Sequence, residues 1–154
     1  MKKIAKTGLL MAAFLVAMNA FSQSDGQAAA DRGEVIVLSK ADFLASVWNY
    51  EKNSDKWVYE GKLPCVIDFY ADWCGPCRRV APIMKELAKE YKGKVLFYKI
   101  DVDNERELAS VFQVSSIPSY LFIPATGDPQ TGVGAYSRDF FVKAINDFLL
   151  KKEL

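Results

Sequence analysis

Two cysteines, Cys74 and Cys77, stand one helical turn apart where an apolar run gives way to a helical pattern. The run at 66–70 (VIDFY) is typical of a strand, and the apolar residues of 78–87 recur at helical spacing. The first sulfur would then lie over the free N–H groups of the helix start, whose partial positive charge favours thiolate over thiol. The spacing therefore predicts a redox-active thiol pair.

The composition is that of an ordinary globular domain and restricts the alternatives. The chain has 154 residues, of which 51% are hydrophobic and 25% charged, with a formal net charge of +1. Basic residues alternate with acidic ones, so no nucleic-acid surface is expected. With three cysteines and no histidine, the chain lacks the four ligands of a structural zinc site. We expect neither a metal nor a bound cofactor.

The first 22 residues have the pattern of an export signal. An apolar run at 8–18 and a small-x-small site ending at Ser22 follow three basic residues, Lys2, Lys3 and Lys6. Cleavage there would leave a mature chain that starts at Gln23. The apolar run is shorter than the roughly 20 residues that span a bilayer, although a retained N-terminal anchor stays open. We expect an exported protein, in a bacterial periplasm or similar space.

The rest of the chain divides into a flexible linker at 23–33 and a folded domain at 34–154. The expected strands span 34–38, 64–70, 94–100, 119–123 and 131–135. One expected helix runs from the cysteine pair to Tyr91. The other expected helices span 40–51, 104–112 and 138–151. Their expected caps are Ser39, Asp103 or Asn104, and Ser137, and a kink is expected at Pro82. This order predicts an α/β fold, a mixed sheet with helices on both faces.

Several landmarks in order resemble the thioredoxin family. They are DFYADWCGPC at 68–77, Ala81-Pro82, Lys99-Ile100-Asp101, Ile117-Pro118 and Val133-Gly134-Ala135. The resemblance covers Glu34 to the C-terminus and implies the thioredoxin fold, with a cis peptide bond before Pro118. The Gly-Pro dipeptide between the cysteines is similar to that of reducing members, whereas oxidising periplasmic members usually carry a histidine there.

The resemblance implies a role for each cysteine. Cys74 would be the nucleophile, exposed at the helix tip, that forms a mixed disulfide with a substrate. Cys77 would resolve that intermediate by attacking Cys74, which leaves the pair oxidised. Gly75 and Pro76 would keep the turn tight, because proline in the first helical turn loses no needed N–H group.

Asp68 interrupts the apolar pattern of its strand. If it is buried, its pKa should be raised, because burial disfavours the charged form. In the family the matching aspartate lies beneath the second cysteine, which implies that Asp68 is a general base for Cys77, directly or through a water. Lys99 matches the family's partner lysine. The alternative is an exposed acid at the end of a strand.

The resemblance also implies a surface that binds an extended substrate chain. The backbone of Ile117 would pair with that chain beside the cysteines, at the bend formed with Pro118. Trp73, Ile117 and Gly134 would form a flat apolar patch around Cys74. Plain packing is the alternative role for Trp73.

Three further features lie outside these landmarks. Cys65 is expected to be a small buried hydrophobe rather than a redox group. Residues 57–59 depart from the family, and we expect them to pack on the first helix, with a partner site as the alternative. Arg78 and Arg79 are expected to be solvated helix residues.

The leading interpretation is an exported protein-disulfide reductase. Its partners would be disulfide-containing protein substrates and a reducing donor, for which the resemblance suggests a membrane thiol transporter. We expect a monomer. A disulfide oxidase or isomerase would use the same cysteine pair in another direction, and its reduction potential would distinguish it. A non-catalytic binding module would use only the apolar patch.

Overall fold

The computed structural model describes residues 32–151, and in this range five strands form one sheet. The strands are β1 (Val35–Val37), β2 (Cys65–Tyr70), β3 (Leu96–Asp101), β4 (Ser119–Ile123) and β5 (Gln130–Val133). The helices are α2 (Lys40–Ser46), α3 (Gly75–Glu90), α4 (Arg106–Val111) and α5 (Arg138–Ala144), which continues into one π-helical turn, η1 (Ile145–Leu149). The predicted export signal and almost all of the linker lie outside the described residues.

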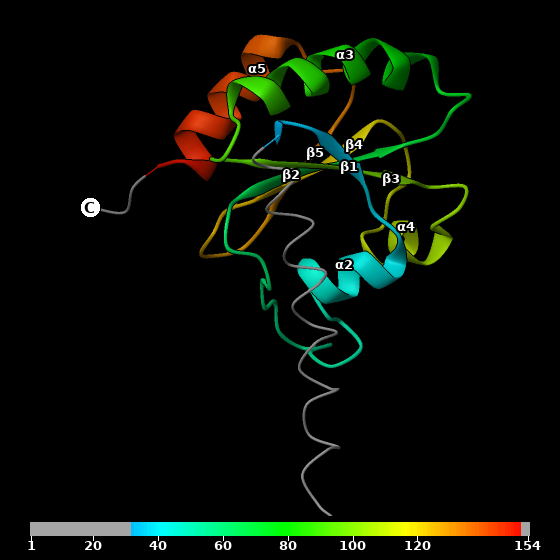
Figure 1. Ribbon diagram of the computed structural model, residues 1–154. Helices are drawn as coiled ribbons and strands as arrows, with labels where there is room; N and C mark the ends of the chain where they lie inside the picture. The colour runs from blue at the N-terminus through cyan, green and yellow to red at the C-terminus, as the bar shows by residue number, and fades with distance from the viewer. Residues whose placement is uncertain (1–31, 152–154) are drawn as a thin grey trace, which may run out of the picture.

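The strand order is β1-β3-β2-β4-β5, with β1, β3 and β2 parallel and the last two strands antiparallel to their neighbours. Helices α3 and α5 cover one face of this sheet, and α2 and α4 cover the other (Figure 1). The predicted mixed sheet with helices on both faces is therefore confirmed. None of the helices between residues 32 and 151 is long and apolar enough to cross a membrane.

Strand β2 lies in the middle of the sheet, and alternate residues serve the two faces. Ile67 belongs to the buried cluster that contains Phe43 of α2, whereas Val66 belongs to the cluster that contains Val80 of α3. Asp68 lies two residues after Val66, so it shares the sheet face covered by α3. Helix α3, with the cysteine pair at its start, thus lies over the face that carries the only charged residue of β2.

Two of the predicted helix starts are confirmed. The hydroxyl oxygen of Ser39 accepts from the backbone N–H of Asp42, and that of Ser137 accepts from the N–H of Phe140. The predicted cap of α4 is wrong, since neither Asp103 nor Asn104 caps the helix and Glu105 precedes it. Both residues bond instead to the carboxylate of Asp101, through the Asp103 N–H and the Asn104 side-chain amide, and this turn delays the helix.

The helix expected over 40–51 ends at Ser46 instead. Trp48 leaves the helical path, packs edge-on against Phe112 with ring centroids 6.2 Å apart, and donates from Nε1 to the carbonyl oxygen of Lys56. These tertiary contacts outweigh the modest helix propensity of the following residues.

Residues 57–59 were expected to pack on the first helix, and Trp57 and Tyr59 do pack against the buried cluster that contains Phe43 of α2. Trp57 lies 5.0 Å from Trp48, centroid to centroid, and Tyr59 donates to the carbonyl oxygen of Leu63. Cys65, just beyond, is fully buried, and burial raises the pKa of its thiol to about 12. Because redox chemistry needs the thiolate, the expectation that Cys65 is a small buried hydrophobe agrees with this environment.

Candidate active site

The cysteine pair occupies the start of α3. Cys74 is the N-cap residue, and its sulfur accepts a hydrogen bond from the backbone N–H of Cys77 over 3.2 Å. The two residues form a disulfide, with Cα atoms 5.3 Å apart. Pro76 stands within the first turn, where its missing N–H group costs no helical hydrogen bond. A backbone N–H directed at the Cys74 sulfur from the start of a helix favours the thiolate over the thiol.

The predicted exposure of Cys74 is wrong for this disulfide form, in which Cys74 and Cys77 are each only 3% exposed. Both sulfurs pack with Ala71, and Ile117 lies against the same cluster. The Sγ of Cys74 lies 3.8 Å from the carbonyl oxygen of Ile117. The Cys74 sulfur is therefore covered by a neighbouring loop rather than projecting into solvent.

That loop carries the predicted cis peptide bond between Ile117 and Pro118. The carbonyl oxygen of Pro118 accepts from the N–H of Gly134, at 2.9 Å, which ties the loop to the end of β5. Gly134 has φ +117°, a conformation that side chains rarely adopt and that favours glycine. The structure thus places Ile117 against Cys74 and links Gly134 to the same loop through Pro118.

Trp73 forms the opposite rim of the site. It is 67% exposed, so plain core packing does not describe it. Its indole Nε1 donates to Oδ2 of Asp103 at 2.8 Å, which holds the ring in place. A hollow of about 350 Å³ lies between Trp73 and Ile117, lined as well by Val102, Val114, Ser115 and Ser116. Gly75 is half-buried and Pro76 exposed at the same end of the helix.

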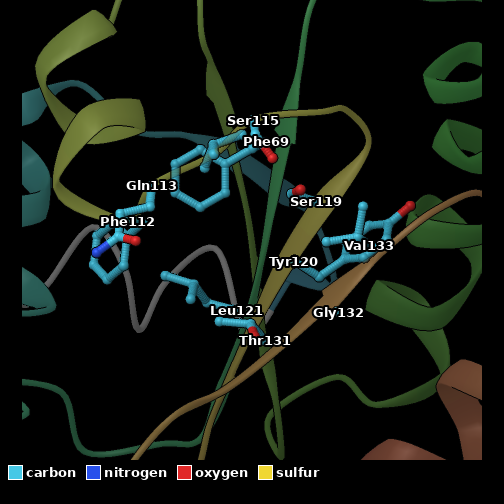
Figure 2. A pocket seen from close by; sticks show the side chains of 11 residues that line it. Phe69, Phe112, Gln113, Ser115, Ser119, Tyr120, Leu121, Thr131, Gly132 and Val133 are labelled. Carbon is cyan, nitrogen blue, oxygen red and sulfur yellow. The ribbon is translucent and has the colours of Figure 1, made fainter.

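A second, smaller hollow of about 120 Å³ lies on the far side of the same loop. Figure 2 shows it between Phe112 and Gln113 on one side and Val133 on the other. It shares Val114 and Ser115 with the first hollow. The loop before the cis bond therefore separates two depressions in the surface.

Asp68 is buried, only 5% exposed, which excludes the alternative of an exposed strand-end acid. Burial raises the pKa of its carboxyl to about 7, and the positive charge of Lys99 opposes this shift. Lys99 is the direct neighbour of Asp68 across the parallel β2–β3 pair, and its ammonium lies 4.8 Å from the centre of the Tyr70 ring. A carboxyl with this pKa can accept or release a proton near neutral pH.

Two contacts at the site were absent from the sequence-based predictions. Asp103, expected to cap a helix, holds the Trp73 indole instead. Arg78 is exposed, as predicted, yet it donates to the carbonyl oxygen of Asp72 at 2.8 Å and so braces the loop before Cys74. The position of Asp103 follows from topology: parallel strands β2 and β3 end at the same edge of the sheet, which brings the residues after them together.

The described residues supply the groups for thiol chemistry. Between residues 32 and 151, no three His, Cys, Asp or Glu side chains are grouped as metal ligands. The disulfide at a helix start, the buried carboxyl and the open rim form a centre that can take up two electrons and two protons and release them again.

Comparison with known proteins identifies the family. The family model Thioredoxin matches residues 45–147. A thioredoxin of Borreliella burgdorferi is 43% identical over 113 residues, which cover 73% of this chain and 96% of that protein. A chloroplastic M-type thioredoxin of Zea mays is 32% identical over 126 residues, covering 82% of this chain and 75% of that protein. The chain therefore belongs to the thioredoxin family and is a thiol–disulfide oxidoreductase that works through its own cysteine pair.

Proposed function

We propose that this thioredoxin works in the direction of reduction, as an exported protein-disulfide reductase. The observation that carries the proposal is the cysteine pair at the start of α3, with the Cys77 N–H directed at the Cys74 sulfur. Only Gly75 and Pro76 separate the cysteines, as in reducing members of the family. Nothing in this dipeptide adds a positive charge that would stabilise the dithiol form further and make the pair a strong oxidant.

The proposed reaction proceeds through two exchanges. The Cys74 thiolate attacks one sulfur of a substrate disulfide, which forms a mixed disulfide and releases the first substrate thiolate. Cys77 then passes its proton to Asp68, directly or through a water, and attacks the Cys74 sulfur. The bond between Cys74 and the substrate breaks, and the second substrate thiolate leaves and is protonated. The substrate disulfide gains two electrons, and the cysteine pair loses them.

The rim of the site supports a protein substrate. The loop that carries Ile117 lies against Cys74, and the hollow beside Trp73 is open to solvent. An extended chain whose backbone pairs with Ile117 would place its disulfide over the Cys74 sulfur. Lys99, as the cationic neighbour of Asp68, would favour the ionised carboxyl that accepts the Cys77 proton.

The reduction potential of the Cys74–Cys77 couple tests the direction of transfer. When the protein is equilibrated with glutathione, we expect a reduction potential of about −270 mV, the value typical of reducing thioredoxins. We also expect rapid reduction of insulin. The handling of substrate is tested with Cys77→Ser, which should retain substrates covalently on Cys74, with Cys74→Ser as the control that retains none. A reduction potential of about −120 mV, the value of a strong oxidant, would make the protein an oxidase instead.

The proposed place of action is an exported space, with a membrane thiol transporter as the reducing donor and with the protein as a monomer. The basic and apolar pattern of residues 1–22 supports export. An oxidising space requires such a donor, because the reductase would otherwise stay oxidised. Mass spectrometry of the protein from fractionated cells checks this proposal: we expect a mature N-terminus at Gln23 in the exported fraction, and an intact Met1 in the cytoplasmic fraction would contradict it.

A further inference from the structure

Three polar side chains form a row across the sheet face that α3 covers. Asp68 of β2 is directly opposite Lys99 of β3 on one side and Tyr120 of β4 on the other. Directly opposed residues of an antiparallel pair project to the same face, with Cβ atoms about 4.5–5.5 Å apart. Tyr120 is thus an immediate neighbour of the buried carboxyl on the side away from Lys99.

Asp68 and Tyr120 each carry a buried polar atom without a hydrogen-bond partner. Tyr120 is 1% exposed and Asp68 is 5% exposed. Within residues 32–151, the hydroxyl of Tyr120 and Oδ1 of Asp68 are buried and make no hydrogen bond to protein. Buried polar groups are nearly always paired, and where the protein supplies no direct partner a buried water commonly bridges them.

Packing holds the Tyr120 ring in one place. The ring meets Phe141 edge-on, with centroids 5.0 Å apart, and Tyr136 lies 5.8 Å away. Burial, and then the nearby charge of Asp68, raise the pKa of the Tyr120 hydroxyl. The group therefore stays protonated at neutral pH and is a permanent hydrogen-bond donor.

We propose that Tyr120 is a positioning residue for the resolution step, whose hydroxyl donates through one buried water to the ionised carboxyl of Asp68. The proposal rests on the role proposed above for Asp68 as the base for Cys77. A hydrogen bond to the charged form of a carboxyl favours that form. Tyr120 would thus raise the fraction of Asp68 that is ready to accept the proton of Cys77.

The other groups around Asp68 have different effects on its ionisation. Lys99 of β3 favours the charged carboxyl through its own charge. Tyr70, on the same strand, is a neutral ring beneath the Lys99 ammonium. Cys77 of α3 is the proposed proton donor. Tyr120 is a neutral donor whose buried hydroxyl has no protein partner within residues 32–151, so it can stabilise the carboxylate without adding a net charge to the core.

The variant Tyr120→Phe tests this assignment, because it removes the hydroxyl and keeps the packed ring. The pKa of Asp68 is measured from the pH dependence of its side-chain carboxyl ¹³C shift. We expect this pKa to rise by about one pH unit, the size of one hydrogen bond to a charged group. Resolution of the mixed disulfide should slow about fivefold at pH 7, and its pH profile should move upward by the same amount, with the rates converging at high pH.

Tyr98→Phe is the matched control. Tyr98 is also a buried tyrosine of the sheet, but it belongs to the cluster on the opposite face. Removing its hydroxyl should leave both the Asp68 pKa and the pH profile of resolution unchanged. Circular dichroism of both variants verifies that the fold is kept.

The outcomes separate this inference from the proposed role of Asp68. An unchanged Asp68 pKa in Tyr120→Phe overturns the assignment, whether or not the overall rate falls, because a purely structural role would not move a titration. An Asp68→Asn variant that resolves mixed disulfides at the wild-type rate would instead remove Asp68 from the mechanism. In that case a shifted pKa in Tyr120→Phe would still establish the contact between the two side chains.

Discussion

Asp68 places a carboxyl in a strand whose other residues from Cys65 to Phe69 are apolar and buried. Its pKa is raised to about 7 because burial disfavours the charge more than Lys99 supports it. The folded protein therefore binds a proton at this site more tightly than the unfolded chain does. A group that helps proton transfer near neutral pH is, for the same reason, a group that weakens the fold at that pH.

We predict that Asp68→Asn stabilises the protein at neutral and alkaline pH. In the unfolded chain the Asp68 carboxyl has its ordinary pKa of about 3.9, whereas in the folded protein the pKa is about 7. The stabilising contribution of the protonated carboxyl is therefore complete below pH 4 and is lost as pH rises to about 7. A difference of about three pH units corresponds to about 4 kcal/mol. Urea unfolding of the wild-type protein and the variant should show that the variant's gain in the free energy of unfolding grows from pH 4 to pH 7 and is constant above pH 8.

The amide of asparagine also needs partners in this site, which will reduce the gain. The pH dependence is the decisive feature, since this cost does not change with pH. A difference between the two proteins that is the same at pH 4 and pH 8 would mean that the carboxyl is not the titrating group.

At the scale of elements, the segment from Trp48 to Leu63 replaces part of a helix with an aromatic layer. Trp48 contacts Trp57 within the segment and Phe112 beyond the end of α4. Lys40 at the start of α2 bridges Glu51 and Glu107, which joins the same two regions at the surface. Because both glutamates are exposed and Lys40 is only half-buried, these ion pairs are weak and the aromatic contacts supply most of the attachment.

We predict that Trp57→Ala loosens this segment without impairing disulfide exchange. Loss of a half-buried indole should lower the free energy of unfolding by about 2 kcal/mol, less than for a fully buried aromatic ring. Hydrogen exchange should accelerate at the amides of 49–63, while insulin reduction stays at the wild-type rate. Lys56→Ala, an exposed neighbour, is the control.

A loss of activity toward protein substrates in Trp57→Ala, with the rate toward a small disulfide unchanged, would contradict the packing role. It would favour the alternative that residues 57–59 form part of a partner site.

At the scale of the whole molecule, the two faces of the sheet hold separate buried clusters, and β2 contributes to both. The active site lies where α3, the end of β2 and the loop before β4 meet. The disulfide closes a short loop between Cys74 and Cys77. Its redox state is therefore linked to the stability of the entire domain.

We predict that the oxidised protein is more stable than the reduced protein by about 2 kcal/mol, the loop-closure entropy of a four-residue ring. Urea unfolding with and without a reductant measures the difference. A Cys74→Ser, Cys77→Ser double variant should not respond to the reductant. Equal midpoints for the oxidised and reduced wild-type protein would show that the reduced site gains compensating interactions.

Local patterns in the sequence were sufficient to predict the sheet, the order of the helices and the two serine caps. The spacing of Cys74 and Cys77 at the junction of a strand and a helix also predicted the disulfide centre, since one turn at a helix start can bring two sulfurs together. The odd position of Asp68 among apolar residues favoured a buried acid with a raised pKa over an exposed acid at the end of a strand. Such features depend on neighbours within a few residues of the chain.

Other features were decided only by the tertiary structure. These features bring together residues that are far apart in sequence: Ile117 covers Cys74, Trp73 bonds to Asp103, and Tyr120 lies beside Asp68. The early end of α2 belongs with them, because Trp48 leaves the helix to contact Phe112. The neighbours of Asp68 depend on which strands pair and in what register, because a shift of one residue would turn every side chain of a strand to the other face. The sequence by itself thus determined the chemistry of the cysteine pair, while the packed sheet decided the exposure of that pair and the neighbours of the buried Asp68, because burial and contact arise only when distant segments meet.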